Sequence, residues 1–263
     1  MSPYRVQAHN TAVASENKIH DDTVARQFGF TGGLVPGVEV YAYMTHMPVA
    51  LWGRDWLARG SAECRFAKPI YDGESATVTS VDASDRLEIS VESRGEICAS
   101  GHASAHHDAA APLLGAFEPV SPPAVRPPAD EQTLATGSWL GIAPLHLTAD
   151  YAARYLHDVR ETDPLYAAEG IAHPGILLRL CNWALTHNVV LGPWIHVGSH
   201  VRNFALARVG DELGARACVA ANYERKGHRF VDLDVLVIAN GTAPLARVIH
   251  TAIYRPRQAA GAA

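Results

Sequence analysis

The stretch LVPGV at residues 34–38 opens a long apolar segment, and a similar stretch, AHPGI, does the same at residues 172–176. Pro36 and Pro174 are 138 residues apart. Two further pairs of markers have the same separation, and these are Phe66 with Phe204, and Glu74 with Glu212. A constant separation over several markers indicates a duplicated unit.

Each copy of this unit continues with the same order of elements. The sequence predicts a helix after each Pro-Gly pair, at residues 38–51 and at residues 176–190. Runs with the alternation of half-exposed antiparallel strands follow each helix. Arg94-Gly95 and Asn240-Gly241 are typical of hairpin turns between strands. The predicted strands lie at residues 77–81, 87–93 and 97–106 in the first copy, and 213–223, 229–239 and 243–254 in the second.

The helix after Pro36 carries apolar side chains around most of its circumference, which is typical of a helix buried on all sides. One buried helix wrapped by an antiparallel sheet is the hot-dog arrangement. We therefore predict an α+β fold with two tandem hot-dog units, a double hot-dog. The first unit covers residues 1–108, a linker rich in Pro and Ala covers residues 109–135, and the second unit covers residues 136–263.

Composition narrows the class of protein. Of the 263 residues, 48% are hydrophobic and 19% are charged, as expected for a folded soluble chain. A net charge of −5 without a Lys/Arg cluster argues against a nucleic-acid partner. No apolar run reaches the length of a membrane span, and the first residues show no signal-peptide pattern. The four cysteines form no CxxC pair, so we expect reduced thiols and a cytoplasmic protein.

The stretch SENKIHDD at residues 15–22 places a histidine among acidic residues just before Pro36-Gly37. His20 titrates near neutrality and could act as a general base. The first N–H groups of a helix are unpaired and lie at the positive end of its dipole, so they can stabilise an oxyanion. We expect Gly37 or Val38 to donate these hydrogen bonds, because Gly37 has no side chain to block the approach.

These residues resemble the signature of the MaoC-like (R)-specific enoyl-CoA hydratases and dehydratases, Asp-x-Asn-Pro-x-His-x-Asp followed by Gly-Phe and a helix-entry glycine. Asn17, His20 and Asp22 occupy the Asn, His and second Asp positions. Gly37 matches the glycine at the start of the central helix. The resemblance implies that His20 is catalytic and that Asn17, Asp22, Gly37 and Val38 bind the substrate.

One carboxylate of the signature is missing. The family's catalytic Asp stands five residues before the histidine, where this chain has Ser15. Ser15 can hydrogen-bond a water molecule but cannot act as a base at neutral pH, and Glu16 could reach the site only from an irregular backbone. We therefore expect His20 to be the base, with Ser15 or Glu16 orienting the water. In the second unit Glu161 occupies the histidine position, which predicts a lost site.

The resemblance implies a hydro-lyase of fatty acid metabolism that reversibly hydrates an enoyl thioester or dehydrates a 3-hydroxyacyl thioester. CoA or carrier-protein pantetheine would be part of the substrate, and neither a metal nor a redox cofactor is needed. A hot-dog acyl-CoA thioesterase and a specialised dehydratase or isomerase remain alternatives. A third hypothesis is a non-catalytic protein that binds acyl groups or small molecules. We also consider pairing of two chains into a homodimer of pseudo-dimers.

Overall fold

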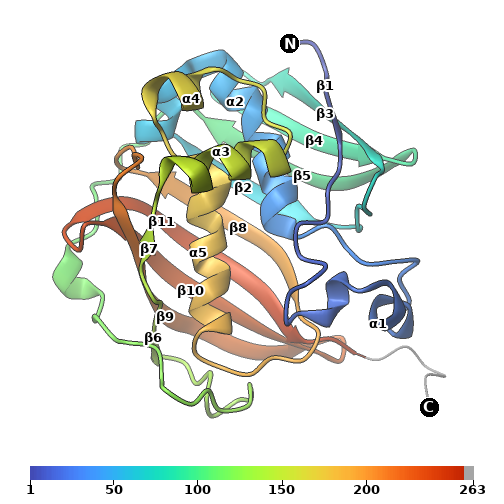
Figure 1. Ribbon diagram of the computed structural model, residues 1–263, viewed down its shortest axis with the longest axis vertical. Helices are drawn as coiled ribbons and strands as arrows, with labels where there is room; N and C mark the ends of the chain where they lie inside the picture. The colour runs from blue at the N-terminus through green and yellow to red at the C-terminus, as the bar shows by residue number, and fades with distance from the viewer. Residues whose placement is uncertain (258–263) are drawn as a thin grey trace.

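The computed structural model describes residues 1–257, which form one antiparallel sheet of 11 strands packed against two central helices (Figure 1). The elements of the first half are β1 Tyr4–Gln7, the 3-10 helix η1 Lys18–His20, α1 Asp22–Gln27, α2 Gly37–Arg59, β2 Ser61–Phe66, β3 Ser75–Asp82, β4 Leu87–Ser93 and β5 Glu96–Ser104. After the short 3-10 helix η2 Leu114–Ala116 come β6 Trp139–Gly141, β7 Leu145–His146, α3 Ala149–Asp158, α4 Leu165–Glu169, α5 Pro174–Thr186, β8 Ile195–Asn203, β9 Glu212–Arg225, β10 His228–Ala239 and β11 Ala243–Arg255.

The order of the strands shows the duplication directly. Along the sheet it is β1-β3-β4-β5-β2-β8-β11-β10-β9-β6, with β7 paired to β9. The first five strands correspond in reverse order to the last five. The two halves meet where β2 pairs with β8, from Ser61 opposite Arg202 to Arg65 opposite Gly198. This arrangement confirms the predicted double hot-dog fold.

The predicted strands and hairpins are confirmed, with small differences at their ends. Arg94 and Gly95 have φ of 57° and 74°, and Asn240 and Gly241 have φ of 52° and 70°, as a tight hairpin turn requires. The helix boundaries differ more. Helix α2 continues past the predicted residue 51 to Arg59, through a bend at Gly53, whose φ of 58° is unfavourable for residues other than glycine. Helix α5 ends at Thr186, before the predicted residue 190.

Helix α2 is buried on every side, as its sequence predicts. Val38, Tyr41, Tyr43, Met44 and Met47 are all buried in one core that also contains the apolar face of α5. The sheet supplies the rest of this core through alternate residues of its strands. None of the helices in residues 1–257 is long and apolar enough to cross a membrane.

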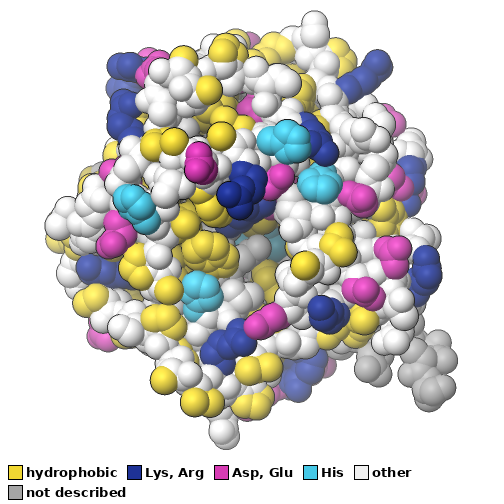
Figure 2. Space-filling model, viewed as in Figure 1, with side chains coloured by type: hydrophobic (Ala, Val, Ile, Leu, Met, Phe, Trp, Pro, Cys, Tyr) yellow, Lys and Arg dark blue, Asp and Glu magenta, His cyan; other side chains and the backbone are white. Residues whose placement is uncertain are grey.

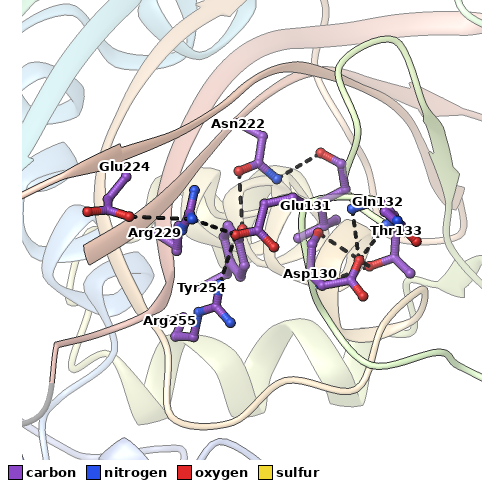
Figure 3. A network of polar contacts seen from close by, with 10 residues as sticks. Asp130, Glu131, Gln132, Thr133, Asn222, Glu224, Arg229, Tyr254 and Arg255 are labelled. Atoms are coloured by element: carbon purple, nitrogen blue, oxygen red, sulfur yellow. Dashed lines mark hydrogen bonds and ion pairs between the residues drawn. The ribbon is translucent and has the colours of Figure 1, made fainter. Parts of the chain in front are cut away.

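The end of the predicted linker is held on the sheet by a polar network (Figure 3). Glu131 forms ion pairs with Arg229 of β10 at 2.8 Å and with Arg255 of β11 at 3.0 Å. Asn222 of β9 donates to the carbonyl of Leu134 at 3.0 Å. These contacts place residues 131–134 against the second half of the molecule.

A buried carboxylate connects the two central helices. Glu39 on α2 is 1% exposed and accepts hydrogen bonds from Arg179 on α5 at 2.6 and 2.8 Å. Tyr155 of α3 and Thr11 donate to the same carboxylate at 3.0 and 3.1 Å. A charge removed from water needs such partners, since it would otherwise destabilise the fold.

We therefore expect Glu39→Gln to lower the free energy of unfolding by about 3 kcal/mol, because it leaves the Arg179 guanidinium without its counter-charge. Urea denaturation measures this change. The matched control is Glu169→Gln, which breaks the exposed pair between Arg54 and Glu169, also a link between the two halves. The control is expected to cost less than about 0.5 kcal/mol. Equal losses for the two variants would contradict the importance of the buried pair.

Candidate active site

A cavity of about 280 Å³ lies where the two halves meet, beside the start of α2. Most of its walls are apolar, and the polar side chains among them include Asn17, His20, Asn182 and His196. Its walls come from both halves, as is common for sites between packed units. Figure 2 shows that the molecule is hollowed beside α5, with hydrophobic, histidine, basic and acidic side chains around the hollow.

Asn17 attaches the segment that carries His20 to the second half. Its Oδ1 accepts from the backbone N–H groups of Trp194 at 3.1 Å and of Ile19 at 3.3 Å. Its Nδ2 donates to the carbonyl of Trp194 at 2.9 Å. The side chain thus caps the 3-10 helix that carries His20 and also fixes that helix against residue 194.

The hydrogen bonds of His20 define its tautomer. Nδ1 lies 2.7 Å from the carbonyl oxygen of Leu34, which can only accept, so Nδ1 carries the proton. Nε2 therefore holds a lone pair, and it lies 3.2 Å from Nδ2 of Asn17. Burial lowers the pKa of His20, although the bond to Leu34 opposes this shift in part. At neutral pH His20 is an uncharged proton acceptor.

The entry of α2 presents free backbone donors. Within residues 1–257, neither the N–H of Gly37 nor that of Val38 donates a hydrogen bond, and Pro36 caps the helix without a side-chain bond. A Cβ at position 37 would lie 2.9 Å from Nδ1 of His196 and 3.1 Å from the Phe66 ring, so only glycine fits. Gly37 lines the same cavity as His20, and Val38 lines the adjoining one.

Ser15 and Glu16 line this adjoining cavity, which has a volume of about 450 Å³ and shares Asn17 and His20 with the first. Ser15 donates to the carbonyl of Asn17 at 3.3 Å. The exposed carboxylate of Glu16 accepts from Arg126 at 2.9 and 3.1 Å, and this bond lowers the pKa of Glu16. The structure brings both residues near the site but pairs neither with His20.

Asp22 supports the glycine-rich turn. Its Oδ1 accepts from the backbone N–H of Gly33 at 2.7 Å. The residue is not among those lining either cavity. Its predicted contact with the substrate remains a prediction, while its hydrogen bond holds the turn that leads to Pro36.

His196 is a cavity residue that the sequence analysis missed. It is 5% exposed, and its Nε2 lies 3.1 Å from the carbonyl of Gly198, which requires a proton on Nε2. Nδ1 then carries a lone pair, and this atom has no hydrogen-bond partner within residues 1–257. Burial, together with the neighbouring His250, lowers the pKa of His196 well below its usual value.

No local pattern marks His196, because the histidines of β8, His196 and His200, form no motif and lie far along the chain from Gly37. A buried acceptor without a donor costs about 1–3 kcal/mol. Nδ1 of His196, beside Gly37, is therefore an acceptor to which a ligand could donate a hydrogen bond.

The corresponding place in the second half is closed. Gly175, the counterpart of Gly37, donates its N–H to Nδ1 of His173 at 3.1 Å. The hydroxyl of Tyr155 fills the space where a Cβ of Gly175 would lie. The helix-entry amide that is free in the first half is thus used internally here.

Glu161 fills the position where the second half would carry its catalytic histidine. Its side chain is 2% exposed and lies 2.9 Å from Nδ1 of His46 and 3.6 Å from Nε2 of His173. Burial by itself would raise the pKa of Glu161, but the imidazoles of His173 and His46 outweigh it and hold that pKa well below its usual value. The carboxylate is an internal structural partner.

Comparison with solved structures supports the fold over almost the whole chain. A candidate MaoC domain dehydratase from Chloroflexus aurantiacus J-10-fl is similar with a TM-score of 0.65 and 11% identity, covering 98% of this chain and 94% of the other. A conserved hypothetical protein with a double hot-dog fold from Mycobacterium tuberculosis gives a TM-score of 0.63 at 13% identity, covering 96% and 95%. A candidate thioesterase from Novosphingobium aromaticivorans DSM 12444 gives 0.56 at 11% identity, covering 97% and 96%.

Neither the comparison with protein-family models nor the one with curated proteins found a match. At these low identities the structural likeness establishes the fold and not the activity. The chain is therefore a double hot-dog protein whose structural neighbours include MaoC-like dehydratases and thioesterases.

Proposed function

We propose that this chain is a MaoC-like hydro-lyase that reversibly adds water to an enoyl thioester to form a 3-hydroxyacyl thioester. One observation carries the proposal. A neutral histidine and the free N–H of Gly37 at a helix entry line one cavity, and Nε2 of that histidine is an acceptor that bonds Asn17 here and could accept from water instead. A proton acceptor and an oxyanion site are the two groups that hydration of an activated double bond needs.

In the proposed reaction, Nε2 of His20 takes a proton from water as the water oxygen bonds to the β-carbon. The π electrons move toward the thioester oxygen, which accepts hydrogen bonds from Gly37 and Val38. His20 then delivers its proton to the α-carbon, so the enzyme returns to its starting state. Each backbone donor in such a site is worth roughly 3–4 kcal/mol of barrier.

The missing carboxylate must be replaced by other groups that hold the water. We assign this role to Ser15, because the carboxylate of Glu16 is occupied by Arg126. Nδ1 of His196 offers a second acceptor on the wall of the first cavity, which His20 also lines. Neither group needs to change its protonation state in this scheme.

The second half contributes the shape of the binding site. Trp194, Ile195, Val197 and Ile253 supply apolar walls to the cavity, which suits an acyl chain. Its own helix entry is capped by His173, so we propose one active site per chain.

A thioesterase is the second candidate, and the serine at position 15 favours it. Without the family's Asp, the site has lost a group that helps to hold water for addition to a double bond. A histidine beside an oxyanion site could instead activate water for attack on the thioester carbon itself.

Two assays separate these functions. Loss of the crotonyl-CoA absorbance reports hydration, and release of free thiol reports hydrolysis. We expect hydration without thiol release. Thiol release alone would replace the proposal with the thioesterase, and the absence of both over several acyl lengths would leave a binding protein.

We expect His20→Ala to lower kcat by about 100- to 10,000-fold, since the reaction loses its base. Steady-state kinetics measure the effect, and thermal unfolding checks that the variant is folded. The matched control is His157→Ala, which removes an exposed histidine of α3. A His20 variant as active as this control would show that the base lies elsewhere.

The pH dependence follows from the burial of His20. Because its pKa is lowered, His20 stays unprotonated and active to below the usual histidine value of about 6.5. The rate should rise with pH through an inflection below that value and then level off. A pH–rate profile of kcat/KM measures the inflection, and one above pH 7 would contradict His20 as the base.

A further inference from the structure

We propose that a groove on the outer face of the sheet binds the nucleotide end of coenzyme A, which makes the substrate a CoA thioester rather than a carrier-protein thioester. The acyl part of this inference rests on the proposed function. The nucleotide site stands on its own observations, and binding to it can be measured without turnover.

The groove has a volume of about 800 Å³ and lies on strands β2, β8, β9, β10 and β11. It adjoins the candidate active site, because several residues line both spaces, and these are Phe66, Ala67, Val197, His228 and Ile253. The ring of Phe66 also lies beside the helix entry, since it would be 3.1 Å from a Cβ at position 37. One extended ligand could therefore occupy the cavity and the groove together.

The charge of the groove is opposite to that of the chain. Its cationic or titratable residues are Arg65, His200, Arg225, Lys226 and His228, and among the described residues no Asp or Glu lines it. The chain as a whole carries a net charge of −5. Such a local concentration of positive charge attracts anionic ligands.

Two of these cations have no counter-charge. Arg225 and Lys226 lie at the tip of the β9–β10 hairpin, and their side chains form no ion pair within residues 1–257. By contrast, Arg229 and Arg255 on neighbouring positions are held by Glu131 (Figure 3), and Arg65 lies 3.1 Å from Glu63. The unpaired guanidinium and ammonium groups suit phosphate oxygens.

The same groove contains an aromatic surface. The rings of Tyr223 and Phe230 are stacked, with centroids 5.2 Å apart and planes 3° from parallel. They are cross-strand partners two residues along the hairpin from the pair of Arg225 and His228. A flat aromatic surface beside free cations matches a base joined to phosphates, since the rings can stack with a purine while the cations bind the phosphates.

The residues of this surface come from a part of the fold that is longer in the second half. Strands β9 and β10 contain 14 and 12 residues, whereas their counterparts β3 and β4 contain 8 and 7. The extra length carries the hairpin tip with Arg225 and Lys226. A concave groove of this size fits a small-molecule ligand better than the flat contact that a carrier protein would make.

The experiment is isothermal titration of the full chain with coenzyme A and with pantetheine, which lacks the nucleotide. We expect CoA to bind at least about tenfold more tightly, and raised salt to weaken CoA binding more than pantetheine binding. The variant Arg225→Gln/Lys226→Asn should lose about tenfold in CoA affinity and keep its pantetheine affinity. Asn at position 226 tolerates the positive φ of 53° found there.

The matched control is Arg202→Ala, which removes an exposed arginine of β8 that does not line the groove. It should bind CoA like the parent chain. Equal affinity for CoA and pantetheine, no measurable CoA binding, or an unchanged affinity in the double variant would each overturn the inference. If CoA is preferred but crotonyl-CoA is not hydrated, the proposed function fails and the nucleotide site stands.

Discussion

The antiparallel pairing of β2 with β8 is the contact on which the rest of the structure depends. Each of these strands follows the central helix of its own half, so their pairing joins the five strands of the first half and the six of the second into one continuous sheet. The joined sheet buries α2 and α5 in one shared core. It also brings the start of β8, with Trp194 and His196, against the segment that carries His20. The candidate site therefore exists only because the halves are joined at this seam.

The two halves have diverged at equivalent places in opposite ways. At Gly37 the helix entry keeps free N–H groups and an adjacent cavity, while at Gly175 the amide is capped by His173 and the space is filled by Tyr155. Glu161 has become an internal partner of two histidines, and Glu39 joins α2 to α5. After such changes the first half keeps His20 and the free helix entry, while the second half adds cavity walls, the Nδ1 acceptor of His196 and the lengthened β9–β10 hairpin.

The prediction from sequence was most accurate where local chemistry decides the structure. The hairpins at Arg94-Gly95 and Asn240-Gly241 need positive φ, and the apolar circumference of α2 needs complete burial, so both could be predicted. The end of α2 could not be predicted, because the helix bends at Gly53 and then continues to Arg59. His20 and Gly37 could be linked through a motif, and the structure places both on one cavity. His196 belongs to no motif, so sequence offered no signal for it.

By itself, the sequence determined the duplicated unit, the buried central helix, the antiparallel strands and the residues of the first half that resemble a catalytic signature. These features follow from periodicity, turn chemistry and spacing, which are properties of neighbouring residues. Only the tertiary structure decided the direction of the Glu16 carboxylate, the tautomers of His20 and His196, and the meeting of cavity and basic groove. Those depend on partners such as Arg126, Leu34 and Gly198, whose positions are set by strand pairing and packing rather than by distance along the chain.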